Sequence, residues 1–184
     1  MNKDRKTFLQ QGLAGLLGMM TAPTLLATPG NDTLRKGLVV HADEGETYWI
    51  GKRNSPLTIK IARDRKGGNN FSFCTEEIAP CQGVPVHKHL NEDELIFLHT
   101  GEGLLTLGDE EVAVRQGSVA LVPKGEWHAL RNTGKEPLLM VFSYSPAGFE
   151  GYFRELGSPA GTPWQPKSPE EFARLDKKWG IVYK

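Results

Sequence analysis

The sequence of 184 residues has no excess of charge of either sign, because 22 basic side chains balance 22 acidic ones. A neutral chain offers no electrostatic attraction for nucleic acid or for an anionic membrane surface, so we expect neither as a partner. Cysteine is scarce, with only Cys74 and Cys81. They lie seven residues apart on an expected extended segment, roughly 20 Å and too far for a disulfide. We expect both to be free thiols unless the chain folds back sharply at Pro80.

A long apolar run is missing as well. Lys3, Arg5 and Lys6 precede an uncharged stretch over residues 12–20, and small and proline residues follow to Ala27. That stretch is too short to span a bilayer, and the layout is typical of a signal peptide. We therefore expect residues 1–27 to be a signal peptide and the mature protein to be periplasmic, with no stable membrane association. An amphipathic arm or a membrane anchor is the alternative. Residues 4–10 resemble a twin-arginine signal in which Lys6 replaces the second arginine.

Glycine (21 residues) and proline (12) are plentiful, which favours many turns and short strands. The length suits one domain. Short β-type segments follow one another from residue 38 to 146, separated by turn clusters such as residues 67–68, 108–109 and 132–134. The expected strands cover residues 48–51, 58–62, 70–78, 84–89, 94–100, 104–107, 111–114, 118–122, 126–131 and 138–145. This spacing predicts an all-β sandwich or barrel.

After Pro146 the pattern changes to helix. Phe149, Tyr152, Phe153 and Leu156 form one apolar stripe at helical spacing, which predicts a helix lying on the barrel. The run Ser168-Pro169-Glu170-Glu171 is typical of a capping box, and it precedes a second stripe formed by Phe172, Leu175 and Trp179. A proline-rich linker over residues 157–167 joins the two helices. Residues 147–184 are thus expected to be a C-terminal helical extension.

Histidine and glutamate are concentrated in one stretch. His87 and His89 are two apart, so on a strand both imidazoles point the same way. Glu94 opens the next strand, where hairpin pairing would bring its carboxylate beside them, and His128 lies on a much later strand. Three neutral imidazoles and one carboxylate on rigid strands are a suitable ligand set for a divalent transition metal.

The joint spacing of these residues is more informative than each residue alone. The two segments resemble the two signature motifs of the cupin family: Gly83-x3-His87-x-His89-x4-Glu94-x6-Gly101 and Gly117-x5-Pro123-x-Gly125-x2-His128-x3-Asn132. The first departs in one place, with three residues between its glycine and His87 where the family usually has five. The resemblance implies a double-stranded antiparallel β-helix, the jelly-roll barrel, over residues 38–146.

The resemblance also implies roles. His87, His89, Glu94 and His128 are the expected metal ligands, with Glu92 as the rival of Glu94, although only Glu94 keeps the six-residue interval to Gly101. His41 and His99 match no ligand position. The cofactor would be one divalent transition metal, namely Fe, Mn, Ni, Cu, Co or Zn. The glycines and prolines of the motifs and Asn132 would be structural.

The segments around the first motif and at residues 146–150 resemble the quercetin 2,3-dioxygenase-like branch of cupins. This resemblance implies a metal-dependent dioxygenase for a small enolisable or aromatic substrate, with Glu94 as the catalytic base. The alternatives are a cupin isomerase and a non-catalytic, metal-dependent binder of a sugar or metabolite. Exposed edge strands and an apolar face favour a homodimer. The expected cavity-lining side chains are Phe71, Phe73, Phe97, Trp127, Met140 and Phe142.

Overall fold

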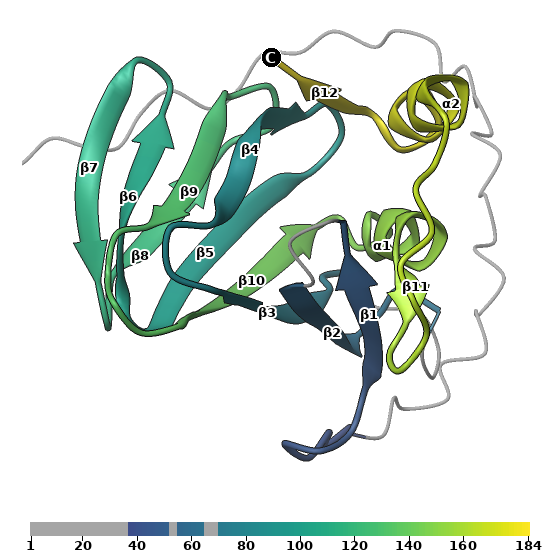
Figure 1. Cartoon of the computed structure of the whole chain (residues 1–184), viewed down its shortest axis with the longest axis horizontal. Helices are drawn as coiled ribbons and strands as arrows, with labels where there is room; N and C mark the ends of the chain where they lie inside the picture. The colour runs from purple at the N-terminus through teal and green to yellow at the C-terminus, as the bar shows by residue number, and fades with distance from the viewer. Residues whose placement is uncertain (1–36, 52–54, 65–69) are drawn as a thin grey trace, which may run out of the picture. The chain divides into compact units, whose positions relative to one another are not determined.

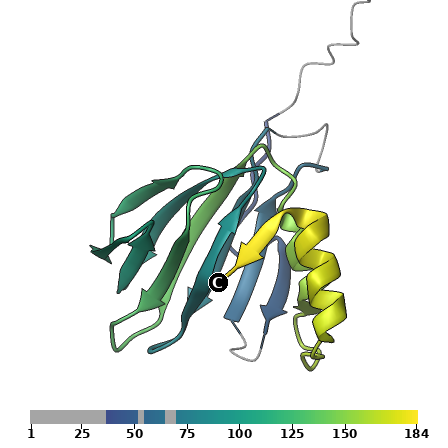
Figure 2. The same ribbon diagram turned by 90° about the horizontal axis from the view of Figure 1, so that it is seen from above.

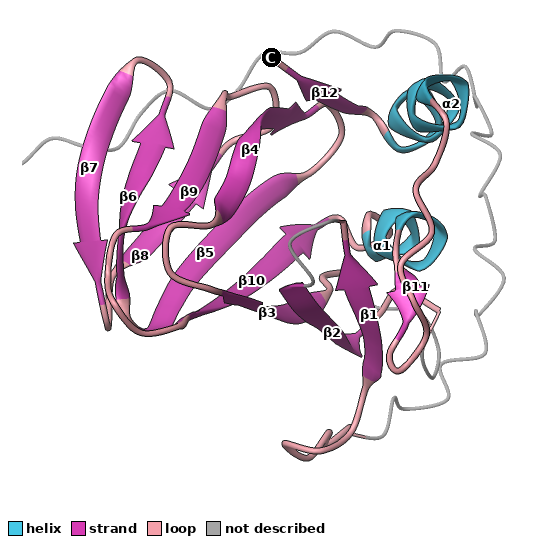
Figure 3. Cartoon of the chain, viewed as in Figure 1, coloured by secondary structure: helices cyan, strands magenta, loops and turns pink. Residues whose placement is uncertain are grey.

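The computed structural model describes residues 37–51, 55–64 and 70–184. The expected signal peptide lies outside the described residues. Export to the periplasm therefore stays a prediction. Within them the chain forms two antiparallel sheets and two helices (Figures 1 and 3). The larger sheet runs in the order β11-β1-β2-β3-β10-β5-β8. Its strands are β1 (Glu46–Ile50), β2 (Ser55–Ile61), β3 (Phe73–Ile78), β5 (Asp93–Thr100), β8 (Val119–Val122), β10 (Leu138–Ser145) and β11 (Ser158–Pro159).

The smaller sheet runs in the order β12-β4-β9-β6-β7. Its strands are β4 (Gly83–His89), β6 (Glu102–Leu107), β7 (Glu110–Arg115), β9 (His128–Asn132) and β12 (Ile181–Tyr183). All ten strands expected from the sequence are present, with ends shifted by at most three residues. The predicted double-sheet antiparallel barrel is therefore confirmed.

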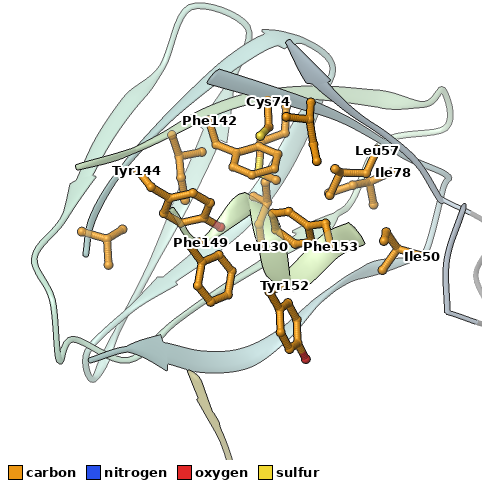
Figure 4. Close-up of a cluster of buried hydrophobic side chains, with 14 of the residues drawn as sticks. Ile50, Leu57, Cys74, Ile78, Leu130, Phe142, Tyr144, Phe149, Tyr152 and Phe153 are labelled. Atoms are coloured by element: carbon orange, nitrogen blue, oxygen red, sulfur yellow. The ribbon is translucent and has the colours of Figure 1, made fainter. Parts of the chain in front are cut away.

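The core lies between the two sheets, as strand alternation requires. On β10, Leu138, Met140, Phe142 and Tyr144 are all buried, while the residues between them are more exposed. Leu130 of β9 approaches from the smaller sheet, and Figure 4 shows the aromatic rings of β10 beside those of Phe149, Tyr152 and Phe153. These rings contact one another and are all buried in the core.

The two predicted helices are α1 (Glu150–Leu156) and α2 (Pro169–Trp179). The capping box of α2 is formed as expected: Glu171 N donates to Ser168 Oγ at 3.2 Å, and Ser168 N donates to the Glu171 carboxylate at 2.8 Å. The apolar stripe of α1 is buried on the barrel, which confirms that prediction. Among the described helices, neither combines the length and apolar character needed to cross a bilayer.

The C-terminal extension is less purely helical than predicted, because it adds a strand to each sheet. Within the expected linker, β11 pairs with β1. After α2, the chain turns at Gly180 and continues as β12, the short strand that ends at the C-terminus in Figure 2. β12 pairs antiparallel with β4, and Tyr183 is the register partner of His87. A three-residue strand carries too little alternation to be recognised from sequence, so β12 was missed.

Candidate metal centre

Three histidines and one glutamate come together between the two sheets. His87 and His89 lie on β4 and His128 on the neighbouring β9, where His87 and His128 are direct register partners. All four side chains are buried, and their ligand atoms lie within 4.8 Å of one another. The sequence therefore identified a real cluster: His87, His89, Glu94 and His128.

Glu94 reaches the cluster by a different route from the one expected. β4 and β5 do not pair as a hairpin, since β5 belongs to the larger sheet and pairs with β8 and β10. The carboxylate approaches from the sheet that faces the histidines. The hairpin expectation was wrong because the short polar turn between β4 and β5 crosses from one sheet to the other.

Two of the histidines are held by backbone carbonyl groups. A carbonyl oxygen only accepts hydrogen bonds, so His87 Nδ1–H donates to Pro85 O at 2.8 Å and His128 Nδ1–H donates to Glu126 O at 3.1 Å. In the neutral rings this leaves the Nε2 lone pair of each imidazole to bind another group. Fixing one ring nitrogen in this way is how proteins orient histidines that ligate metals.

His89 is the side chain of the cluster whose ring nitrogens lack hydrogen-bond partners in the described part of the chain. It is buried, and neither ring nitrogen has a hydrogen-bond partner among the described residues. His89 Nε2 lies 3.3 Å from Glu94 Oε2, but outside hydrogen-bonding geometry. A buried polar atom without a partner costs about 1–3 kcal/mol. A cation bound at Nε2 would remove much of that cost.

The electrostatics of the cluster agree with a site for a cation. Burial lowers the pKa of His87 to about 3, with help from the neighbouring His128 and His89, so this ring is neutral. Burial alone would raise the pKa of Glu94, but the hydrogen bond with His128 and the proximity of His89 outweigh it and hold that pKa well below its usual range. Neutral imidazole and ionised carboxylate are the protonation states in which these groups bind metals.

The donor set fits a divalent transition metal. Bonds of about 2.1 Å allow two ligand atoms on one ion to lie up to about 4.2 Å apart. The largest separation in the cluster is 4.8 Å, so side-chain movements of about 0.5 Å would bring all four onto one ion. Three nitrogens and one carboxylate also leave coordination positions for a small molecule.

The remaining candidates from the sequence are placed as follows. Glu92, the rival of Glu94, is buried but stands outside the cluster, and burial raises its pKa to about 7. His41 and His99 are exposed, as expected for residues that match no ligand position. Cys74 and Cys81 are free, which confirms the absence of a disulfide between them.

The second motif builds the loop that carries His128. Gly125 has φ +84°, a conformation that favours glycine, and its N–H donates to His89 O at 2.6 Å. Asn132 is buried at the other end of β9, where its amide donates to Ile78 O and Glu136 O. These contacts fix both ends of the strand on which His128 lies.

A narrow cavity of about 50 Å³ opens on the cluster. Of the six side chains expected to line it, only Met140 and Phe142 do so. The other four lie elsewhere. Phe71 and Phe73 are partly exposed, and Phe97 lies on the opposite face of β5 from Glu94. Trp127 packs against the ammonium groups of Lys88 and Lys184. The other aromatic side chains of the lining are Tyr144, Phe149, Tyr152, Phe153 and Tyr183.

Sequence reasoning missed these five aromatics, although a signal existed for most of them. Tyr144 continues the alternation of Met140 and Phe142 on β10, and Phe149, Tyr152 and Phe153 form the stripe of α1. The ring of Phe149 packs edge-on against His89 with centroids 4.3 Å apart. The aromatic stripe is therefore part of the site as well as part of the core.

Comparisons with known proteins agree with this geometry. A family model described as the cupin domain matches residues 74–144. An oxalate-binding protein of Thermotoga maritima is 32% identical over 107 residues, which is 55% of this chain and 88% of that protein. The chain belongs to the cupin family. Another relative, the tetracenomycin polyketide synthase protein TcmJ of Streptomyces glaucescens, is 31% identical over 116 residues, 56% of this chain and 78% of that protein.

Solved cupin structures share the fold. The crystal structure of a predicted oxalate decarboxylase from Thermotoga maritima matches with a TM-score of 0.54 and 23% identity, covering 59% of this chain and 99% of that one. An RmlC-like cupin from Shewanella frigidimarina matches with a TM-score of 0.51 and 13% identity, covering 61% of this chain and 93% of that one. At these identities the likeness concerns the fold.

The one departure of this cupin from the first motif has a structural explanation. Five residues separate Cys81 from His87, so Cys81 occupies the position where the family usually has its glycine. Cys81 follows Pro80 in a turn closed by Gln82 N donating to Ala79 O, and its φ is +64°. The backbone thus keeps the left-handed conformation that favours glycine, and the cysteine adopts it at a cost in strain.

Proposed function

We propose that this cupin is a metal-dependent enzyme, a quercetinase-like dioxygenase that acts on a small neutral substrate with an enol or phenol hydroxyl. One observation carries the proposal: three histidines and an ionised glutamate form a buried cluster, and His87, His128 and Glu94 of that cluster line a cavity whose other walls are mainly apolar and aromatic. An apolar cavity with a few convergent polar groups is the usual form of a small-molecule site.

His87, His89, His128 and Glu94 would hold the ion. When bound, a divalent transition metal supplies Lewis acidity toward a substrate oxygen and, if redox-active, the electron transfer that dioxygen chemistry needs. The aromatic walls exclude water and orient the substrate. Glu94, kept ionised by His128 and His89, would accept the hydroxyl proton at a carboxylate oxygen. Because so acidic a group is a weak base, the substrate hydroxyl must itself be acidic, as an enol is.

The lining also favours a neutral substrate over a dianion. Among the described residues that line the cavity there is no lysine or arginine, whereas two carboxyl side chains, Glu76 and Glu94, are present. A small dicarboxylate would be repelled by the ionised Glu94 and would depend on a bound metal ion for compensation. This charge pattern supports an enol or phenol.

A second candidate function is metal-dependent binding of a small carboxylate without turnover. It is favoured by the relative from Thermotoga maritima, which is called an oxalate-binding protein and is 32% identical to this chain. In this case the four ligands would hold the ion, and oxalate would fit the small cavity as a second set of ligands.

Oxygen uptake and metal analysis test these alternatives. The full chain is purified, its metal content is measured, and forms reconstituted separately with Fe, Mn, Ni, Co, Cu and Zn are mixed with a flavonol. We expect at least one form to consume one O₂ for each flavonol, because a dioxygenase adds both oxygen atoms to its substrate. If no form consumes O₂ with flavonols or other enols, while oxalate raises the melting temperature only when metal is present, the binding function is correct instead.

A further inference from the structure

A second hollow adjoins the metal-site cavity. This outer groove has a volume of about 470 Å³, compared with about 50 Å³ for the inner cavity. The two share four lining residues: Ile50, Pro85, Leu156 and Tyr183. The inner cavity and the outer groove are therefore neighbours that share part of their walls.

The volumes of the cavity and the groove suit different parts of one ligand. A cavity of 50 Å³ exceeds the roughly 10–15 Å³ that a single water needs, and it holds no more than a few water-sized groups. That is enough for the reacting atoms of an enol but not for a whole aromatic molecule. The groove falls in the range of 300–1,000 Å³ that is typical of sites for drug-sized ligands.

The groove is neutral in the part of the chain that the structure describes. Besides the shared residues, its lining includes Gln82, Gly83 and Phe172. None of its described lining residues carries a charge, and Phe172 and Leu156 supply apolar surface. Such a surface suits a flat, uncharged ligand and offers no compensation for an anion.

Tyr183 lines both the cavity and the groove, and its hydroxyl belongs to a chain of hydrogen bonds with Tyr152 and Asp176. Tyr152 Oη donates its only proton to Asp176 Oδ1 at 3.1 Å. The contact of 3.2 Å between Tyr152 Oη and Tyr183 Oη must therefore use the proton of Tyr183. Toward a ligand, Tyr183 then acts as an acceptor, which selects for a hydroxyl group.

The strand β12 holds this hydroxyl in place. Tyr183 is paired with His87 across the strands, and their rings stack with centroids 5.7 Å apart. Lys184 N donates to Val86 O just beyond it. Because β12 is hydrogen-bonded to β4 around Tyr183, its ring is held in place as a wall that the cavity and the groove share.

We propose that the cavity and the groove form one composite binding site for a neutral, planar, hydroxylated aromatic compound. The reacting end enters the cavity beside the four candidate ligands, the flat remainder lies in the groove against Phe172, and a ligand hydroxyl donates to Tyr183 Oη. This proposal rests on the function proposed above and adds to it the site for the distal part of the substrate.

Calorimetric titration of the metal-loaded full chain with two probes tests the composite site. Quercetin is planar and hydroxylated, and flavone is its counterpart without hydroxyl groups. Tyr183→Phe is expected to weaken quercetin binding about threefold to tenfold and to leave flavone binding unchanged, because only one neutral hydrogen bond is lost. Phe172→Ala is expected to weaken both probes by a similar factor, since apolar contact is lost.

Val182→Ala is the matched control, because Val182 neighbours Tyr183 on β12 but does not line the groove. It should leave both affinities unchanged. The composite site is wrong if Tyr183→Phe binds quercetin as well as the parent does, or if the control loses as much affinity as Phe172→Ala. O₂ uptake of the same metal-loaded samples separates the two proposals: absent uptake with the expected binding pattern overturns only the proposed function.

Discussion

Glu94 Oε2 lies 2.9 Å from His128 Nε2, although the two residues lie on strands of different sheets, β5 and β9. His128 Nδ1 already donates its proton to Glu126 O. In the neutral ring, two lone pairs would face each other across this contact. A positive charge must therefore lie between them, either a second proton on His128 or a bound cation. Burial alone would lower the pKa of His128, but Glu94 outweighs it and raises that pKa.

Replacing Glu94 tests whether the cation is a metal. Glu94→Gln keeps the shape of the side chain but removes its charge, so we expect the affinity for divalent transition metals to fall about tenfold or more. The measurement is elemental analysis after dialysis against a competing chelator. Glu92→Gln is the matched control, since Glu92 is buried nearby but outside the cluster. Loss of metal from the control, with metal retained by Glu94→Gln, would make Glu92 the ligand.

The four residues of the cluster could be found from the sequence because their signals are local or follow the intervals of the family motifs. His87 and His89 share a face of one strand by alternation, and the motif intervals of the family include Glu94 and His128. The capping box of α2 was equally visible, since it involves residues three apart. Local patterns depend on a few neighbouring residues, so they can be read without knowing the fold.

The rest of the site depends on pairings between distant residues. β12 pairs with β4, which lies about ninety residues earlier in the sequence. The three residues of β12 form no pattern from which its partner strand could be predicted. Tyr183 was therefore missed, together with the wall it forms over His87. The approach of Glu94 from the facing sheet was missed for the same reason, because a short turn between two strands does not reveal whether they pair or cross over.

The ion pairs of Arg154 predict a pH-dependent contribution to stability. Its guanidinium donates two hydrogen bonds of 2.8 Å to Glu46 and also contacts Asp64, which links α1 to β1 and to the residues after β2. These bonds lower the pKa of Glu46 below its ordinary value of 4.5. A depressed carboxyl pKa stabilises the fold above the unfolded-state value, and the contribution is lost as the pH falls through the folded-state value.

We therefore expect Arg154→Met to lower the free energy of unfolding by about 0.5–1 kcal/mol at neutral pH, a modest value because both groups are partly exposed. The difference from the parent should shrink below about pH 4.5, as Glu46 becomes protonated. Urea denaturation at about pH 7 and about pH 3.5 measures both values. The exposed Arg115→Met is the control and should change neither. A difference that is equal at the two pH values would contradict the ion-pair explanation.

The homodimer expected from the sequence stays a prediction, and the outer face of the larger sheet is where we expect it to form. Leu95 is paired with Leu121, and Val119 and Leu121 on the edge strand β8 are each 62% exposed. Light scattering coupled to gel filtration should give twice the chain mass for the parent. Leu121→Lys should give a monomer, because it places a charge in the apolar face. Val112→Lys on β7, a partly exposed valine of the other sheet, should leave the dimer intact.

Cys81 offers a test of the strain that its position implies. A side chain at φ +64° costs roughly 1–2 kcal/mol relative to glycine, while glycine at the same place loses more conformational freedom on folding. The net expectation is that Cys81→Gly raises the free energy of unfolding by about 0.5–1 kcal/mol and the melting temperature by about 2 °C. Cys81→Ala separates strain from thiol chemistry, because it removes the sulfur and keeps Cβ. Differential scanning calorimetry should show no gain for alanine; an equal gain for both variants would mean that the thiol, and not the backbone, is the source of the effect.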